Sequence, residues 1–134
     1  MSPRILWLIV LAIVAIFAVA ACVSGDASSD PGAYTVDGAE AVEMIESGER
    51  TVIDVRSPGE YAEARVVGAV NINVDGADFG DRIEELDPDE PYLVYCRSGN
   101  RSARAAELRE QAGIKDIADA GGLADLARAG APVE

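Results

Sequence analysis

Cys96 is the residue of this sequence best placed to do chemistry. It follows the apolar run at residues 91–95 and opens a loop of small and basic residues, 97–102, that leads into an Ala- and Leu-rich helical pattern. A glycine and short side chains let backbone N–H groups point inward, and the helix adds the positive end of its dipole, so such a loop binds negative charge. A cysteine thiolate is such a charge, and the pattern therefore predicts a nucleophilic Cys96.

The residues after Cys96 complete the expected site. They are Arg97, Ser98, Gly99, Asn100, Arg101 and Ser102. We expect the loop amides to hold a sulfur anion and the two arginines to attract an anionic substrate. The serines could donate hydrogen bonds to the sulfur, or one of them could cap the helix. A buried structural cysteine is the alternative, but apolar burial does not call for two arginines, two serines and a glycine.

Composition excludes several mechanisms. The chain has 134 residues, enough for one domain, and it has no histidine, which excludes a Cys–His dyad, a histidine general base and His-ligated metal sites. Cys22 and Cys96 are the only thiols, so no cysteine cluster for zinc or iron–sulfur exists either. No metal or organic cofactor is implied. A net charge of −13 argues against a nucleic-acid partner, whereas residues 96–109 carry four arginines against one glutamate and would attract a small anion.

The N-terminus has the pattern of a targeting segment. Arg4 precedes an unbroken apolar run at residues 5–21, which ends in Val-Ala-Ala before Cys22 and resembles a bacterial lipobox. We expect residues 1–21 to be a lipoprotein-type signal peptide, Cys22 to be lipidated, and residues 22–33 to be a flexible tether to a domain at 34–134. An uncleaved signal anchor and a signal peptide cut elsewhere are the alternatives. All three predict an extracytoplasmic domain held at, or exported through, the bacterial cell membrane.

Short apolar runs alternate with amphipathic ones after the tether. Strands are expected at residues 34–36, 51–55, within 68–74, at 91–96 and at 115–118, and helices at 37–47, 57–64, 79–86, 101–112 and 123–129. This alternation predicts an α/β fold with a mainly parallel central sheet flanked by helices on both faces. Sites in such folds form beyond the carboxyl ends of the strands, which is where Cys96 falls.

Four segments together carry a family resemblance. The loop at residues 96–102 (CRSGNRS) resembles the active-site loop of single-domain rhodaneses, sulfurtransferases that carry sulfur as a cysteine persulfide. Residues 53–61 (IDVRSPGEY), 68–72 (GAVNI) and 120–123 (AGGL) agree with the same family in the same order, and the ending is similar to that of a periplasmic member. The resemblance covers roughly residues 34–134 and implies a rhodanese-like fold.

The chain also departs from the family pattern. Ala64-Arg65 replaces the usual Gly-His pair, and prolines are missing near Val67 and Asn73. Leu126 stands where many rhodaneses have tryptophan, and in this the ending is similar to that of the periplasmic member. We expect the loss of the histidine to affect local packing more than chemistry.

Two further sets of residues have expected roles. Asp54 and Arg56, with Glu60 four residues on, are expected to form a structural ion pair at the entrance to the active-site face, with a direct catalytic role as the alternative. Gly121-Gly122 is expected to be a turn.

The resemblance implies that Cys96 takes sulfur from thiosulfate or a similar small anionic donor, forms a persulfide, and passes the sulfur to a thiol or cyanide-like acceptor. A protein acceptor is also possible. Two other function classes remain open at this point. One is a non-catalytic rhodanese-type binding module. The other is a Cys-dependent phosphatase or arsenate reductase, whose loop is one residue longer with arginine at the sixth position, whereas Ser102 is sixth here and Arg101 fifth.

Overall fold

Five short strands of the described part of the chain pair side by side in one parallel sheet, in the order β1-β5-β4-β2-β3. The computed structural model describes residues 32–99 and 102–134, and the side chains of all of these except 102 and 103. The strands are β1 (Ala33–Thr35), β2 (Thr51–Asp54), β3 (Val70–Asn71), β4 (Tyr92–Cys96) and β5 (Ile117–Gly122). All of their mutual pairings are parallel, and a single antiparallel bridge joins Val66 to Val133.

Helices of six to eleven residues alternate with these strands, and the last helix follows the last strand. They are α2 (Gly38–Ser47), α3 (Pro58–Glu63), α4 (Phe79–Glu84), α5 (Ser102–Ala112) and α6 (Leu123–Ala129). Local sequence explains the helix ends: Asp37 caps α2 and Gly48 ends it with a left-handed backbone, while Ser57 caps α3 in a capping box with Glu60. Over the described part of the chain, no helix has the length and apolar character needed to cross a membrane.

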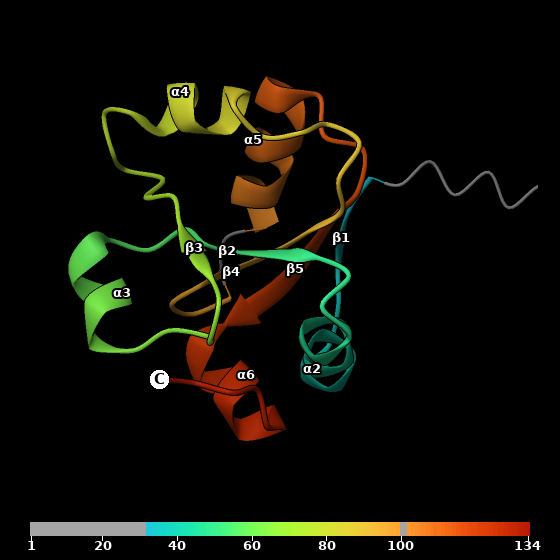
Figure 1. The fold of residues 1–134 in the computed structure, drawn as a ribbon, viewed down its shortest axis with the longest axis vertical. Helices are drawn as coiled ribbons and strands as arrows, with labels where there is room; N and C mark the ends of the chain where they lie inside the picture. The colour runs from blue at the N-terminus through green and yellow to red at the C-terminus, as the bar shows by residue number, and fades with distance from the viewer. Residues whose placement is uncertain (1–31, 100–101) are drawn as a thin grey trace, which may run out of the picture.

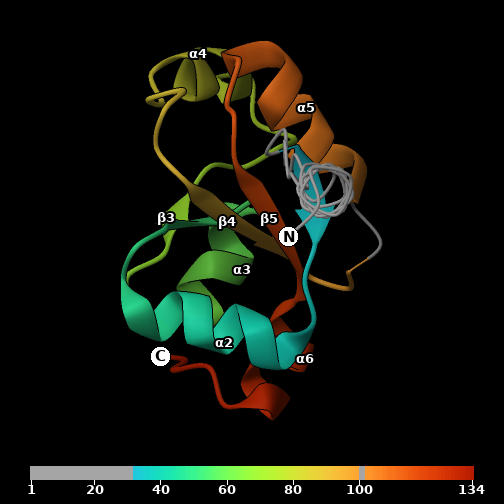
Figure 2. The ribbon, with the colours of Figure 1, turned by 90° about the vertical axis from the view of Figure 1, so that its right-hand side faces the viewer.

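The helices cover both faces of the sheet. Figures 1 and 2 show α4 and α5 on one side of the strands and α2 and α6 on the other. Alternate residues of β4 follow this division, because Tyr92, Val94 and Cys96 belong to the core on the α4/α5 side, whereas Leu93 and Tyr95 belong to the core on the α2/α6 side. The expected α/β architecture with helices on both faces is confirmed.

The last strand, β5, differs from the strand that the sequence predicts. A strand at 115–118 and a turn at Gly121-Gly122 were expected, but β5 runs from Ile117 to Gly122 and includes both glycines. Both predictions are wrong for one reason. β5 lies between β1 and β4: residues 117–119 pair with both neighbours and Gly122 pairs with Cys96 of β4, so pairing extends the strand through residues whose own strand preference is low. Elsewhere, α4 stops at Glu84 rather than residue 86, and the strand expected within 68–74 is limited to Val70–Asn71.

A buried polar network joins β2, β4 and the segment after α3. Asp54 is fully buried, and its carboxylate accepts hydrogen bonds from the backbone and guanidinium of Arg56 and from the Tyr95 hydroxyl at 2.8 Å. The Tyr95 oxygen in turn accepts from the Val66 amide at 3.1 Å, and Arg56 also donates to the Ala64 carbonyl at 2.6 Å. Each buried polar group therefore has a partner, so the network ties the α3 connection to the two central strands.

Position 65 shows how the chain accommodates a departure from the family pattern. Arg65 stacks on the Tyr61 ring at 4.9 Å and pairs with the Glu134 carboxylate at 2.7 Å. The backbones of residues 65 and 134 exchange two hydrogen bonds of 3.0 Å. Arg65 thus fastens the C-terminal residues against the segment that follows α3.

Replacing Tyr95 with phenylalanine should lower the free energy of unfolding by about 1–3 kcal/mol at neutral pH, because the Asp54 carboxylate loses a donor and the Val66 amide loses its acceptor. Urea unfolding of both proteins measures this difference.

The same pair of proteins should also differ at alkaline pH. Burial, with a further contribution from the Asp54 carboxylate, raises the pKa of Tyr95 above its ordinary range. The unfolded chain loses the tyrosine proton near pH 10, so the stabilisation is complete below that pH and is lost as the pH rises further. Unfolding free energy should therefore fall more steeply above about pH 10 in the wild type than in Tyr95→Phe. Parallel curves would contradict this assignment.

Candidate active site

Cys96 is the last residue of β4, a strand with neighbours on both sides. It is 3 % exposed and belongs to the apolar core beneath α4 and α5. The loop beyond it leads to Ser102, the first residue of the eleven-residue helix α5. The Cys96 thiol is thus positioned between the carboxyl end of a central strand and the N-terminus of a helix, the arrangement in which backbone amides stabilise an anion.

The loop packs directly against the end of β5. A Cβ on Gly122 would lie 2.9 Å from the Arg97 carbonyl oxygen, which is closer than real Cβ atoms come, and one on Gly99 would lie 3.5 Å from the Gly121 Cα. Gly99 and Gly121 both have left-handed backbones, with φ of 72° and 74°. The two glycines of β5 therefore form a backbone wall for the cysteine loop, and side chains there would displace it.

The described basic residue of the loop is open to solvent. The Arg97 side chain is 78 % exposed, and its Nε lies 3.8 Å from the Glu60 carboxylate at the start of α3. Hydrogen bonding to the Ser57 amide lowers the pKa of Glu60, so this carboxylate stays ionised at neutral pH. Because the Arg97 side chain is exposed and its ion pair with Glu60 is long and weak, its guanidinium can bind an anion from solvent.

Asp54 and Arg56 lie behind the nucleophile. Their ion pair is present at 2.6 Å, but it binds Tyr95, whose side chain is on the opposite face of β4 from Cys96. Glu60 is not part of this pair, since its carboxylate accepts from Ser57 and approaches Arg97. In this geometry Asp54 and Arg56 brace the strand that carries Cys96.

The structure brings together only some of the expected site. Ser98 is exposed and Gly99 forms the turn of the loop, whereas Asn100 and Arg101 lie outside the described residues, as does the side chain of Ser102. Cys22 and the segments at 1–21 and 22–31 also lie outside them. The contribution of Gly121 and Gly122 to the loop was not foreseen. A glycine pair at a strand end is the sequence signal that could have pointed to it.

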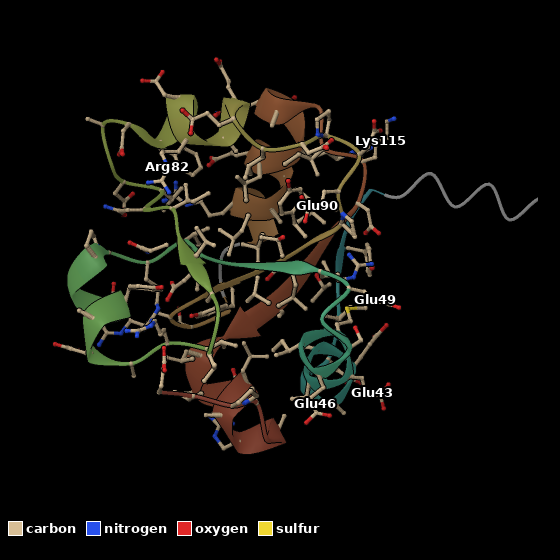
Figure 3. All side chains as sticks on the ribbon, in the orientation of Figure 1. Glu43, Glu46, Glu49, Arg82, Glu90 and Lys115 are labelled. Carbon is tan, nitrogen blue, oxygen red and sulfur yellow. The ribbon has the colours of Figure 1, made fainter. Side chains whose placement is uncertain are left out.

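Other chemistry has little support in the described residues. No three side chains of the His, Cys, Asp and Glu types gather there in a way that could hold a metal ion. A hollow of about 450 Å³ between β1 and α5 is lined by Ala33, Ala106, Arg109 and Glu110, none of which is a nucleophile. Figure 3 shows the acidic side chains of Glu43 and Glu46 on α2 and of Glu49 just after it.

Comparisons with known proteins agree with this geometry. Residues 37–127 match the model of the rhodanese-like domain. The chain is 38 % identical over 77 residues to thiosulfate sulfurtransferase PspE of Escherichia coli, which covers 56 % of this chain and 72 % of that protein. It is 33 % identical over 95 residues to thiosulfate sulfurtransferase GlpE of Pseudomonas putida, which covers 71 % of this chain and 84 % of that protein.

Solved structures share the fold. A rhodanese-related protein from Thermoplasma volcanium superposes with a TM-score of 0.62 at 31 % identity, covering 75 % of this chain and 96 % of that one. The rhodanese-like domain of an Anabaena protein gives a TM-score of 0.64 at 25 % identity, covering 78 % of each chain. The cysteine at the end of β4, its glycine-walled loop and these matches lead to one conclusion: the chain belongs to the rhodanese family and is a rhodanese-type sulfurtransferase.

Proposed function

We propose that Cys96 is the sulfur carrier and that a small anionic sulfane-sulfur compound of the thiosulfate type is the donor. The supporting observation is the position of Cys96, buried at the carboxyl end of β4 and followed by the exposed Arg97 and the N-terminus of α5. The names of the E. coli and P. putida relatives agree with thiosulfate as donor. In a chain without histidine, backbone amides and arginines stabilise the reacting sulfur.

Sulfur transfer then proceeds in two displacements. The Cys96 thiolate attacks the outer sulfur of thiosulfate, the S–S bond of the donor breaks, and sulfite leaves with the bonding electron pair. The Cys96 persulfide anion remains. An acceptor thiolate or cyanide then attacks the outer sulfur of the persulfide and leaves the Cys96 thiolate behind. The loop amides hold the anionic sulfur in both steps, and no proton needs to be transferred in either displacement.

The carrier assignment predicts a mass change. The domain from Ala33 onward, incubated with thiosulfate, should gain the mass of about one sulfur atom, and Cys96→Ser should gain none, because Cys96 is the only thiol beyond residue 22. Intact-protein mass spectrometry before and after treatment with a reducing thiol provides the measurement. Sulfur uptake by the Cys96→Ser protein would exclude Cys96 as the carrier.

The arginines should act mainly in donor capture. Arg97→Ala or Arg101→Ala should lower kcat/KM for thiosulfate by the equivalent of about 1–3 kcal/mol, and added salt should weaken the wild type in the same direction. Arg128→Ala is the matched control, since the Arg128 side chain on α6 is similarly exposed at 75 % and pairs with Asp125 on the same helix. Unchanged kinetics in both loop variants would assign donor binding to the backbone amides alone.

We also propose that the domain is extracytoplasmic and tethered to the bacterial cell membrane through Cys22. Support comes from the apolar run at residues 5–21, the lipobox-like Val-Ala-Ala-Cys ending, and the start of β1 at Ala33, the last residue of the expected tether. A lipid on Cys22 would leave Cys96 without an intramolecular disulfide partner in an oxidising compartment.

The tether proposal predicts the chemistry of the N-terminus. The wild-type protein should partition into detergent and carry acyl mass on a peptide that begins at Cys22. Cys22→Ala should block lipidation and cleavage together and leave a longer precursor, seen by gel mobility and mass spectrometry. A wild-type chain that keeps residues 1–21 and carries no acyl group would show an uncleaved anchor instead.

A further inference from the structure

Asp119 is a buried acidic residue that has no part in the proposed sulfur-transfer steps. It lies in β5 and is 6 % exposed. Its Oδ1 atom accepts a hydrogen bond of 3.0 Å from the Gly121 amide, while its Oδ2 atom is buried and has no hydrogen-bond partner among the residues that the structure describes. A buried carboxylate oxygen without a partner costs stability, so an apolar residue would serve the core better at this position.

The register of the sheet places Asp119 on the same face as Cys96. Its neighbours Ala118 and Ala120 belong to the α2/α6 core, so Asp119 points to the α4/α5 side, where Cys96 lies. Asp119 pairs with Val94, two residues before Cys96, and after an irregularity in the ladder Cys96 pairs with Gly122. The carboxylate and the nucleophile are therefore diagonal neighbours on adjacent strands.

The bond to Gly121 connects Asp119 with the cysteine loop. It holds the amide of a residue whose φ is 74°, at the irregularity where β5 meets the loop. The next residue, Gly122, packs so closely on the Arg97 carbonyl that a Cβ would lie 2.9 Å from its oxygen. Any shift of Gly121 and Gly122 is thus transmitted to the backbone that follows Cys96.

We propose that Asp119 is a positioning residue for the Cys96 loop. Its Oδ1 atom fixes the position of the Gly121–Gly122 backbone, and this backbone in turn fixes the position of the loop that surrounds the reacting sulfur. This proposal deepens the proposed function and rests on it for the role of Cys96. Small displacements of reacting groups cost large factors in rate, so loss of the Gly121 hydrogen bond should slow sulfur loading about tenfold or more.

Three variants test the proposal. Asp119→Ala removes the acceptor, whereas Asp119→Asn keeps a side-chain oxygen at the same place and removes only the charge. Asp116→Ala is the matched control, because Asp116 just precedes β5 and pairs with Arg50 at the opposite end of the strand, so its loss costs stability far from the loop. Each protein is followed by thermal unfolding, by the rate of sulfur loading from thiosulfate, and by the rate of Cys96 alkylation with iodoacetamide.

The expected pattern separates positioning from general destabilisation. Asp119→Ala should remain folded and load sulfur at least tenfold more slowly, Asp119→Asn should stay within about threefold of the wild type, and Asp116→Ala should lose stability but keep its loading rate. Wild-type loading in Asp119→Ala would overturn the proposal, as would an Asp119→Asn protein as slow as Asp119→Ala. If the wild type itself takes no sulfur from thiosulfate, the proposed donor is wrong. The rates of Cys96 alkylation then test Asp119: the proposal expects a changed rate in Asp119→Ala and wild-type rates in Asp119→Asn and Asp116→Ala, and a wild-type rate in Asp119→Ala would overturn it.

Discussion

The buried carboxylate of Asp54 is the constraint on which the arrangement of the site depends. A fully buried carboxylate is stable only when its oxygens are occupied, and here Arg56 and Tyr95 occupy them. Because Tyr95 directly precedes Cys96 on β4, the network fixes the strand from behind while the nucleophile faces the other layer. The same network secures Ala64 just after α3, the helix that also carries Glu60 toward Arg97. The position of Cys96 on one face of β4 therefore depends on the hydrogen bonds that Tyr95 makes on the other face.

Two glycines, which have no side chains, form the opposite side of the loop. Gly121 and Gly122 bring the β5 backbone into contact with the chain after Cys96, and no larger residue would fit at Gly122. The loop is therefore held between a polar network behind β4 and a backbone wall on β5. Stabilisation of a reacting sulfur by such a confined loop would need no side-chain base, which agrees with the complete absence of histidine.

Charge is distributed in a way that suits an anionic donor. The net charge of −13 would repel thiosulfate from most of the surface, and acidic side chains such as Glu43 and Glu46 project along α2 in Figure 3. The loop instead presents the exposed Arg97 ahead of the N-terminus of α5. Attraction at the site, set against repulsion elsewhere, would concentrate small anions where the nucleophile lies, and it would weaken as salt is added.

Local sequence was enough to determine the α/β class, most helix ends, and the position of Cys96 between a strand and a helix. Asp37, Gly48 and Ser57 act through neighbours within a few residues, so their roles can be deduced from sequence alone. Only the tertiary structure decided that Gly121-Gly122 forms a strand, that these glycines touch the cysteine loop, and that Asp54 binds Tyr95 on the far face of β4. Those features depend on strand order and register, which bring together residues distant in the sequence, and no local propensity specifies such pairings.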